Sequence, residues 1–204
     1  MSAPQPFRPL PREPISLDAR AADHLRYIRE TMERAGEFTG VPGWGGAAAG
    51  LTAVAAAYLA SRQATPQRWL TIWLVEALLA VAILAPAAAA KARRISGSLL
   101  SGPGRKFLLS FAPPVVVGAL LTVALVRAGL FGVLPGMWLL LYGTAIVTGG
   151  AFSVRVVPVM GVCLMALGAA ALVAPAVLGD LFMAVGFGAA QVGFGLWIAL
   201  RYGG

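Results

Sequence analysis

Two polar side chains lie inside long apolar stretches of the sequence, where a polar group is costly. Glu76 lies seven residues after Trp69, which places it about 10 Å further along a helix that rises 1.5 Å per residue. An acid at that depth in a membrane usually faces a bundle interior or water, and it can bind a proton or a cation. The alternative is a structural role, in which Glu76 forms a hydrogen bond or pairs with an arginine near the same leaflet. Gln191, in the last apolar stretch, completes the candidate intramembrane polar site.

Two further polar groups are expected to connect helices. Gln191 is predicted to form an interhelical hydrogen bond with Thr144 or Thr148. Substrate binding is the second interpretation of this amide. Asp180 lies beside a predicted turn, where an ion pair with Arg127 is expected.

Residues that carry metal, haem or covalent chemistry are scarce. Cys163 is the single cysteine and His24 the single histidine, so the chain can build neither a zinc site from several thiolates nor a haem site from paired histidines. We expect Cys163 to be a small buried apolar residue. The glycine-containing segment 91–106 has Pro103 where a phosphate-binding loop requires lysine. No nucleophile has a base to activate it, which predicts a non-enzyme with no metal and no cofactor.

The composition defines the environment of these residues. The chain has 204 residues, of which 59% are hydrophobic and 12% are charged, with a mean hydropathy of +0.81. Soluble domains carry about twice that charged fraction, and disordered chains are much less hydrophobic. The sequence therefore predicts an all-α integral membrane protein.

Six apolar segments have about the length needed to cross a bilayer, which is about 20 residues. The predicted spans are 43–60, 69–90, 107–126, 129–149, 156–175 and 177–200. Short connections after the third and fifth spans require the joined helices to run antiparallel. We predict that 43–204 is a transmembrane bundle of six helices, arranged as three antiparallel hairpins.

The basic residues predict the orientation of the bundle. Thirteen of them fall on one side of the predicted spans, and three fall on the other. Because cytoplasmic segments carry an excess of lysine and arginine, we expect both termini in the cytoplasm and the spans in the inner (plasma) membrane. We attribute the formal net charge of +8 to anchoring at anionic lipids rather than to nucleic acid. The residues expected at lipid headgroups are Lys91, Arg93, Arg94, Arg105 and Lys106.

Aromatic residues near the span ends resemble the belts that tryptophan and tyrosine form at membrane interfaces. By this rule Tyr58, Trp69 and Trp73 belong at the outer interface. Trp44 is expected to anchor the start of the first span.

The N-terminal region is predicted to lie outside the membrane. Residues 1–15 form a proline-rich tail that we expect to be disordered. Residues 16–39 are predicted to form a cytoplasmic amphipathic helix, whose docking face comprises Leu25, Ile28 and Met32. Membrane-surface helices usually carry excess lysine and arginine, whereas the charges here are balanced. We therefore expect docking on the protein's own cytoplasmic face or on a partner; a solvated helix is the alternative.

Glycines recur at seven-residue intervals in two predicted spans. They are Gly129, Gly136, Gly143 and Gly150 in the fourth span, and Gly179, Gly186 and Gly193 in the sixth. Seven residues make about two helical turns, so each set lines one face of its helix. Small residues let helices in lipid approach closely, so these faces are the predicted packing seams. A shift of 43 residues places Gly136, Gly143 and Gly150 on Gly179, Gly186 and Gly193, and Gly118 on Gly161, which suggests a duplicated hairpin.

A related pattern extends over about 107–200. It comprises Gly161, Gly168, Pro175, Gly186 and Gly193, together with Gly118, Pro135, Gly143 and Gly150. In these glycine-spaced segments with prolines near tight turns, the chain resembles the HdeD-like acid-resistance membrane proteins. The resemblance implies a six-span bundle and a role in inner-membrane stress tolerance, without catalytic residues. It does not include residues 16–44.

These features predict a non-enzymatic multi-pass inner-membrane protein that acts through assembly, as an accessory, scaffold or stress-related component. Its expected partners are membrane lipids and either further copies of itself, in a homo-oligomer, or other membrane protein subunits. The alternative is a small transporter or channel that carries protons or a small cation and uses Glu76. A water-filled cavity shared by Glu76 and Gln191 would favour transport, whereas Glu76 capped by an arginine in a closed bundle would favour the scaffold.

Overall fold

The computed structural model describes residues 24–25, 40–95 and 102–203. Six helical segments within these ranges are long and apolar enough to cross a membrane. This confirms the all-helical class and the six apolar helices, and it supports a multi-pass membrane protein. The first five are α2 (Gly43–Ser61), α3 (Pro66–Ile95), α4 (Gly102–Arg127), α5 (Leu134–Gly150, preceded by η1, Phe131–Val133) and α6 (Val156–Val173).

The sixth segment contains four consecutive elements. They are η2 (Ala176–Leu178), α7 (Gly179–Met183), η3 (Ala184–Ala190) and α8 (Gln191–Tyr202). The element η3 is a π-helix, whose wider turn changes the direction of every side chain that follows it.

The connections between helices follow from local residue chemistry. Pro135 lies in the first turn of α5, where its missing N–H is not needed and its fixed φ favours the helix. Gly129 follows the end of α4 with a φ of +73°, a conformation that glycine adopts more easily than other residues. Gly129 therefore belongs to the turn between α4 and α5, and its predicted place in a packing seam is wrong.

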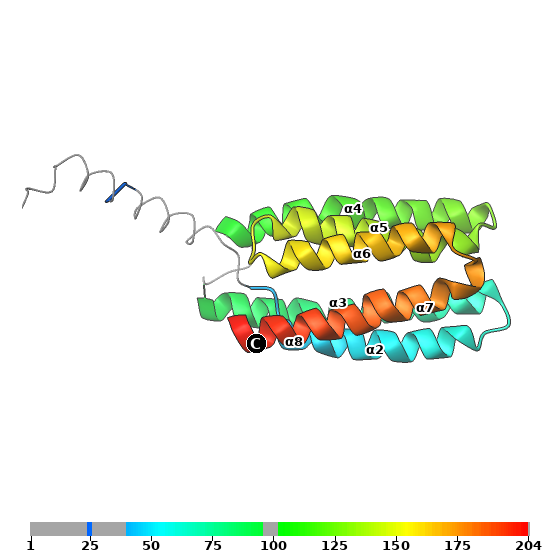
Figure 1. Ribbon diagram of the computed structural model, residues 1–204, viewed down its shortest axis with the longest axis horizontal. Coiled ribbons are helices and arrows are strands. Elements are labelled where there is room, and N and C mark those ends of the chain that lie inside the picture. Colours follow the sequence, from blue (N-terminus) through cyan, green and yellow to red (C-terminus); the bar gives the residue numbers. More distant parts are fainter. Residues whose placement is uncertain (1–23, 26–39, 96–101, 204) are drawn as a thin grey trace, which may run out of the picture. The chain divides into compact units, whose positions relative to one another are not determined.

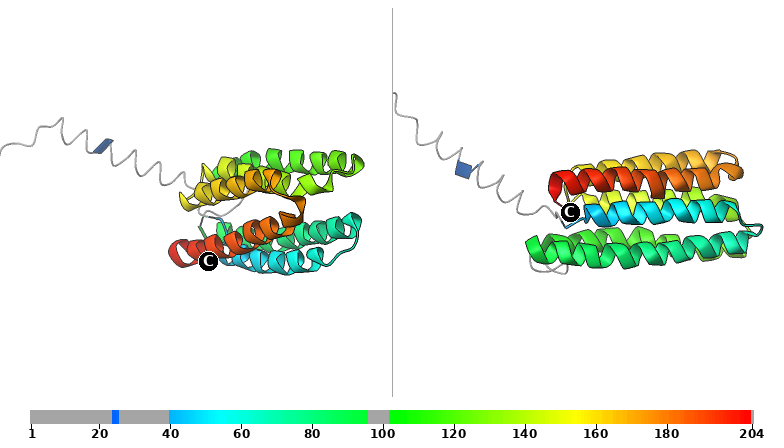
Figure 2. Two further views of the ribbon diagram at one scale, coloured as in Figure 1. Left: turned by 45° about the vertical axis from the view of Figure 1, so that its right-hand side comes forward. Right: turned by 90° about the horizontal axis from the view of Figure 1, so that it is seen from below.

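The helices form two groups, seen as two layers in Figure 1 and again in the left view of Figure 2. In the first helix group, α2 packs against both α3 and the sixth segment. In the second helix group, α5 packs against both α4 and α6. The central helices α2 and α5 run in opposite directions (Figure 1).

This packing differs in part from three separate hairpins. The pairs α2 with α3 and α4 with α5 lie side by side, but α6 packs mainly on α5, and α8 mainly on α2. The helices of the third predicted hairpin therefore have different principal neighbours, because their small-residue faces meet different helices. The repeat at a 43-residue shift does not describe this arrangement.

The N-terminal unit, Met1–Gly36, is separate from the unit Glu37–Gly204. In it, His24 and Leu25 are helical and exposed, and Leu25 is 67% exposed. Ile28 and Met32, the remainder of the predicted docking face, lie outside the described residues, as does the predicted tail 1–15.

Candidate functional site

The closest helix contacts of the second helix group are at glycines of α5 and α6. A Cβ added to Gly143 would lie 2.7 Å from the carbonyl oxygen of Gly161, and a Cβ added to Gly161 would lie 2.7 Å from that of Gly143. Gly136 and Gly168 face each other in the same way, with both distances at 2.9 Å. Gly150 continues the contact toward Val157 at 2.9 Å. Only residues without a side chain allow the two backbones to approach this closely.

A second glycine seam joins α2 to the sixth segment. A Cβ added to Gly50 would lie 2.8 Å from the carbonyl oxygen of Gly188, and one added to Gly195 would lie 2.9 Å from that of Gly43. The sequence pattern did not identify this seam, because its residues are divided between the first and last spans. The signal was present as a seven-residue spacing in each: Gly43 with Gly50, and Gly188 with Gly195.

Two of the three glycines predicted for the seam of the sixth span pack against α5, and the third has no close neighbour. Gly179 faces the ring of Pro135 at 3.0 Å, and Gly186 contacts the end of the Leu139 side chain, so both face α5. A Cβ added to Gly193 would have no neighbour within 4 Å. The assignment of Gly193 to a seam is therefore wrong, because no neighbouring helix comes this close to it.

Glu76 connects α3 to α2 inside the bundle. It is 7% exposed, and its Oε1 lies 2.8 Å from Oγ1 of Thr52. The same Oγ1 lies 2.8 Å from the carbonyl oxygen of Ala49. A hydroxyl has only one hydrogen, so Thr52 either donates to an ionised Glu76 or donates to Ala49 and accepts from a protonated Glu76. The two hydrogen-bond arrangements differ by one proton.

This geometry agrees with the structural alternative for Glu76, in which its carboxyl group forms a hydrogen bond. Its hydrogen-bond partner is a threonine, not an arginine, and Gln191 is bonded to a different residue. The carboxyl group nevertheless lies in a closed part of the bundle, since the residue is 7% exposed.

Gln191 connects the two helix groups. It is 7% exposed, and its Nε2 donates to Oη of Tyr142 on α5 at 2.9 Å. The predicted partners Thr144 and Thr148 instead donate to backbone carbonyls, those of Leu140 at 2.8 Å and Ser110 at 2.9 Å. The expected interhelical hydrogen bond is present, with another partner.

Trp69 lies inside the bundle rather than at an exposed interface. Its Nε1 donates to Oδ1 of Asp180 at 2.6 Å, and its ring stacks on Trp138 with centroids 5.7 Å apart and planes 7° from parallel. Trp69 thus faces neighbouring helices, and Asp180 has Trp69 as its partner instead of Arg127. The sequence pattern missed this contact because the two partners are 111 residues apart.

Trp73 is the most deeply buried of these aromatic residues. It is 4% exposed, and its Nε1 has no hydrogen-bond partner within the described part of the chain. Phe187 of η3 packs against its ring with centroids 6.4 Å apart. Trp73 lies three residues before Glu76, so the two share a face of α3. Trp73 is therefore not exposed to the surroundings of the bundle, because this face of α3 points inward.

The two helix groups meet through aromatic rings. The aromatic layer comprises Trp69, Trp73, Trp138, Tyr142 and Phe187. Trp69 meets Trp138 across the groups, and Phe187 meets Tyr142 with centroids 5.2 Å apart. Each group is thus joined internally by glycine seams and to the other group by large side chains.

The basic residues divide into one buried lysine and several exposed side chains. Lys91 is 6% exposed, and its Nζ donates to the carbonyl oxygens of Val41, at 3.0 Å, and of Gly203. Lys91 is therefore buried rather than exposed, because the end of α3 packs against both chain segments that supply these carbonyls. The other four predicted headgroup residues, Arg93, Arg94, Arg105 and Lys106, are exposed.

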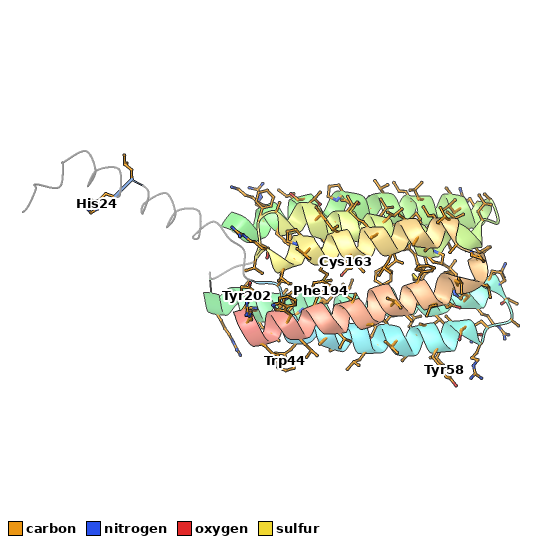
Figure 3. The ribbon with its side chains drawn as sticks, viewed as in Figure 1. His24, Trp44, Tyr58, Cys163, Phe194 and Tyr202 are labelled. Atoms are coloured by element: carbon orange, nitrogen blue, oxygen red, sulfur yellow. The ribbon has the colours of Figure 1, made fainter. Side chains whose placement is uncertain are left out.

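Cys163 is exposed rather than buried, as Figure 3 shows on α6. The helix buries Gly161 and Leu164, and Cys163 lies on the outward side between them. Figure 3 also places Trp44 and Tyr202 toward one end of the bundle and Tyr58 toward the other. In the described ranges, no group of three or more His, Cys, Asp or Glu side chains could hold a metal ion.

No family model, no curated protein and no solved structure matches this chain. The functional argument therefore depends on the geometry. That geometry provides a buried carboxyl bonded to a threonine, an indole N–H without a partner among the described residues, and polar contacts that hold helices together.

Proposed function

We propose that the protein is a non-enzymatic subunit of the inner membrane that acts through assembly, as an accessory, scaffold or stress-related component. The observation that carries this proposal is the pairing of polar side chains within the bundle: Glu76 with Thr52, Gln191 with Tyr142, and Asp180 with Trp69. Side chains already bonded to each other in a closed bundle hold helices in place. The resemblance to the HdeD-like proteins supports the stress-related form of this role.

The outer helices support the same proposal. The spans of α3 and α4 both have a mean hydropathy of 2.2, and only 11% of each is buried inside the bundle. Most of their apolar surface therefore meets lipid or another membrane subunit. We propose membrane lipids and either a second copy of this chain or other membrane protein subunits as partners.

Extraction from native membranes in lipid nanodiscs tests this proposal. Native mass spectrometry of the tagged chain should detect an assembly heavier than the 21.0 kDa monomer. Glu76→Gln is the control, because the amide can still bond Thr52 and assembly should persist. A lone monomer in nanodiscs prepared from several growth conditions, acid stress included, would contradict the proposal.

A second candidate function is a small transporter or channel for protons or a small cation. Two observations favour it: the two proton-dependent arrangements at Thr52, and the Nε1 of Trp73 on the same helix face, which has no hydrogen-bond partner among the described residues.

Proton flux into proteoliposomes tests the second candidate. A pH-sensitive dye inside the vesicles should report flux for the unchanged chain, and Glu76→Gln should abolish it. Asp180→Asn is the matched control, since it removes one carboxylate bonded elsewhere and should leave the flux intact. Absence of flux in the unchanged chain, or equal flux in both variants, would exclude transport through Glu76.

A further inference from the structure

A pocket of about 170 Å³ lies where the beginning of α2 meets the end of α3. Its apolar wall includes Pro42, Ala87 and Ala90. Trp44 contributes an indole ring, and Lys91 and Arg94 contribute two cationic side chains. The candidate spans begin at Gly43 and end at Arg94 on this side. The pocket therefore lies at the depth of lipid headgroups.

The charge of Lys91 has no carboxylate partner among the described residues. The two described acids, Glu76 and Asp180, bond Thr52 and Trp69, and Glu76 lies fifteen residues earlier on α3, about 22 Å away at 1.5 Å per residue. An ammonium group has three N–H donors, and two of them reach neutral carbonyl oxygens. A buried charge is costly unless an opposite charge pairs with it, so this environment favours an anion.

Arg94 supplies a second cation to the same pocket. It lies three residues after Lys91, on the same face of α3, and it is exposed. A guanidinium binds phosphate oxygens through two parallel hydrogen bonds. The first turn of α2 adds a positive helix end. The pocket thus provides the positive charge and the hydrogen-bond donors that a phosphate group requires.

Trp44 favours a lipid over a free anion as the ligand of this pocket. Its side chain is 56% exposed, and tryptophan favours the headgroup level of a bilayer. Together with the alanine and proline wall, it offers apolar contact that inorganic phosphate cannot use. We propose that this pocket binds the phosphodiester headgroup of an anionic phospholipid, with Lys91 and Arg94 at the phosphate and Trp44 beside the glycerol and upper acyl chain.

Arg93 provides a matched control for this site. It is exposed like Arg94 and adjacent in sequence, but it does not line the pocket. Arg94→Gln and Arg93→Gln remove the same charge from the same helix end. General attraction to an anionic membrane is therefore equal for the two variants, and only the pocket distinguishes them.

The experiment titrates the purified full-length chain, in neutral detergent, with phosphatidylglycerol and counts bound lipids by native mass spectrometry. Arg94→Gln should weaken the tightest binding event about tenfold, the loss expected for one charge-assisted contact, whereas Arg93→Gln should change it less than twofold. Phosphatidylcholine should not occupy the site. Equal losses of lipid binding in both variants would show nonspecific attraction to anionic lipid. Displacement of the lipid by millimolar inorganic phosphate would show a site for a free anion. Either result would overturn the proposal.

A second measurement does not depend on the folding of Arg94→Gln. Brominated phosphatidylglycerol should quench the fluorescence of the unchanged chain more than that of Trp44→Phe, and brominated phosphatidylcholine should quench the two equally. Equal quenching of the two chains by the anionic lipid would also overturn the proposal.

Discussion

Gly143 and Gly161 lie against each other's carbonyl oxygens where α5 crosses α6, and the contact is reciprocal at 2.7 Å. Gly50 of α2 and Gly188 of the sixth segment form a similar contact in the first helix group. These pairs show how a chain with little polar surface holds its helices together in lipid, where no hydrophobic effect brings them together.

Gly143→Ala should destabilise the bundle by about 1–3 kcal/mol, because the new methyl group has no space against the backbone of α6. Gly193→Ala is the control, since a Cβ there meets open space, and it should be close to neutral. Reversible unfolding in bicelles measures both. Equal effects of the two substitutions would mean that α5 and α6 do not pack through this seam.

Thr52→Val should cost about 1–3 kcal/mol of unfolding free energy, because it leaves the buried carboxyl of Glu76 without its partner. In a Glu76→Leu background the same substitution should cost much less. The double-mutant cycle therefore measures the contact itself. A coupling energy near zero would show that the two side chains are not bonded in the membrane.

Trp69→Phe should weaken the bundle by about 1–2 kcal/mol, because the phenyl ring cannot donate to Asp180. The matched control is Trp197→Phe, at a side chain that is 52% exposed. Thermal unfolding in detergent can compare the two variants. A loss for Trp197→Phe as large as that for Trp69→Phe would contradict the buried position of Trp69.

Tyr142→Phe should cost about 0.6 kcal/mol, the average for a hydrogen bond between membrane helices. It removes the acceptor of Gln191, which joins the two helix groups. Tyr58→Phe serves as the control, since Oη of Tyr58 bonds Arg62 at an exposed position, and it should have little effect. Hydrogen exchange should then show faster opening around α8 only in Tyr142→Phe.

Much of the fold could be predicted because it depends on properties that are local in the sequence. The length of each apolar stretch indicates a span, and the spacing of Gly136, Gly143 and Gly150 indicates one face of α5. That face packs against α6, as the contacts of all three glycines show. The pattern could not reveal the π-helix before Gly193 or the turn at Gly129, since both depend on backbone conformation.

The surroundings of the candidate site could not be predicted, because they join residues far apart in sequence. Trp69 and Trp73 have the residue type and position of interfacial anchors, yet their helix face is covered by α5, α7 and η3. Lys91 has the type of a headgroup residue, yet two backbone carbonyls from distant segments surround its ammonium group. Only the packing of the helices determines which of these side chains meet lipid.

The central claim is that the chain crosses the membrane six times with both of its termini on the cytoplasmic side. Cysteine labelling of intact cells with an impermeant maleimide tests it, in a Cys163→Ala background with single cysteines at exposed positions: Ala64→Cys, Lys106→Cys and Arg201→Cys. The account predicts that Ala64→Cys reacts in intact cells, and that the other two react only after the cells are permeabilised. Labelling of Lys106→Cys in intact cells as fast as that of Ala64→Cys would contradict it.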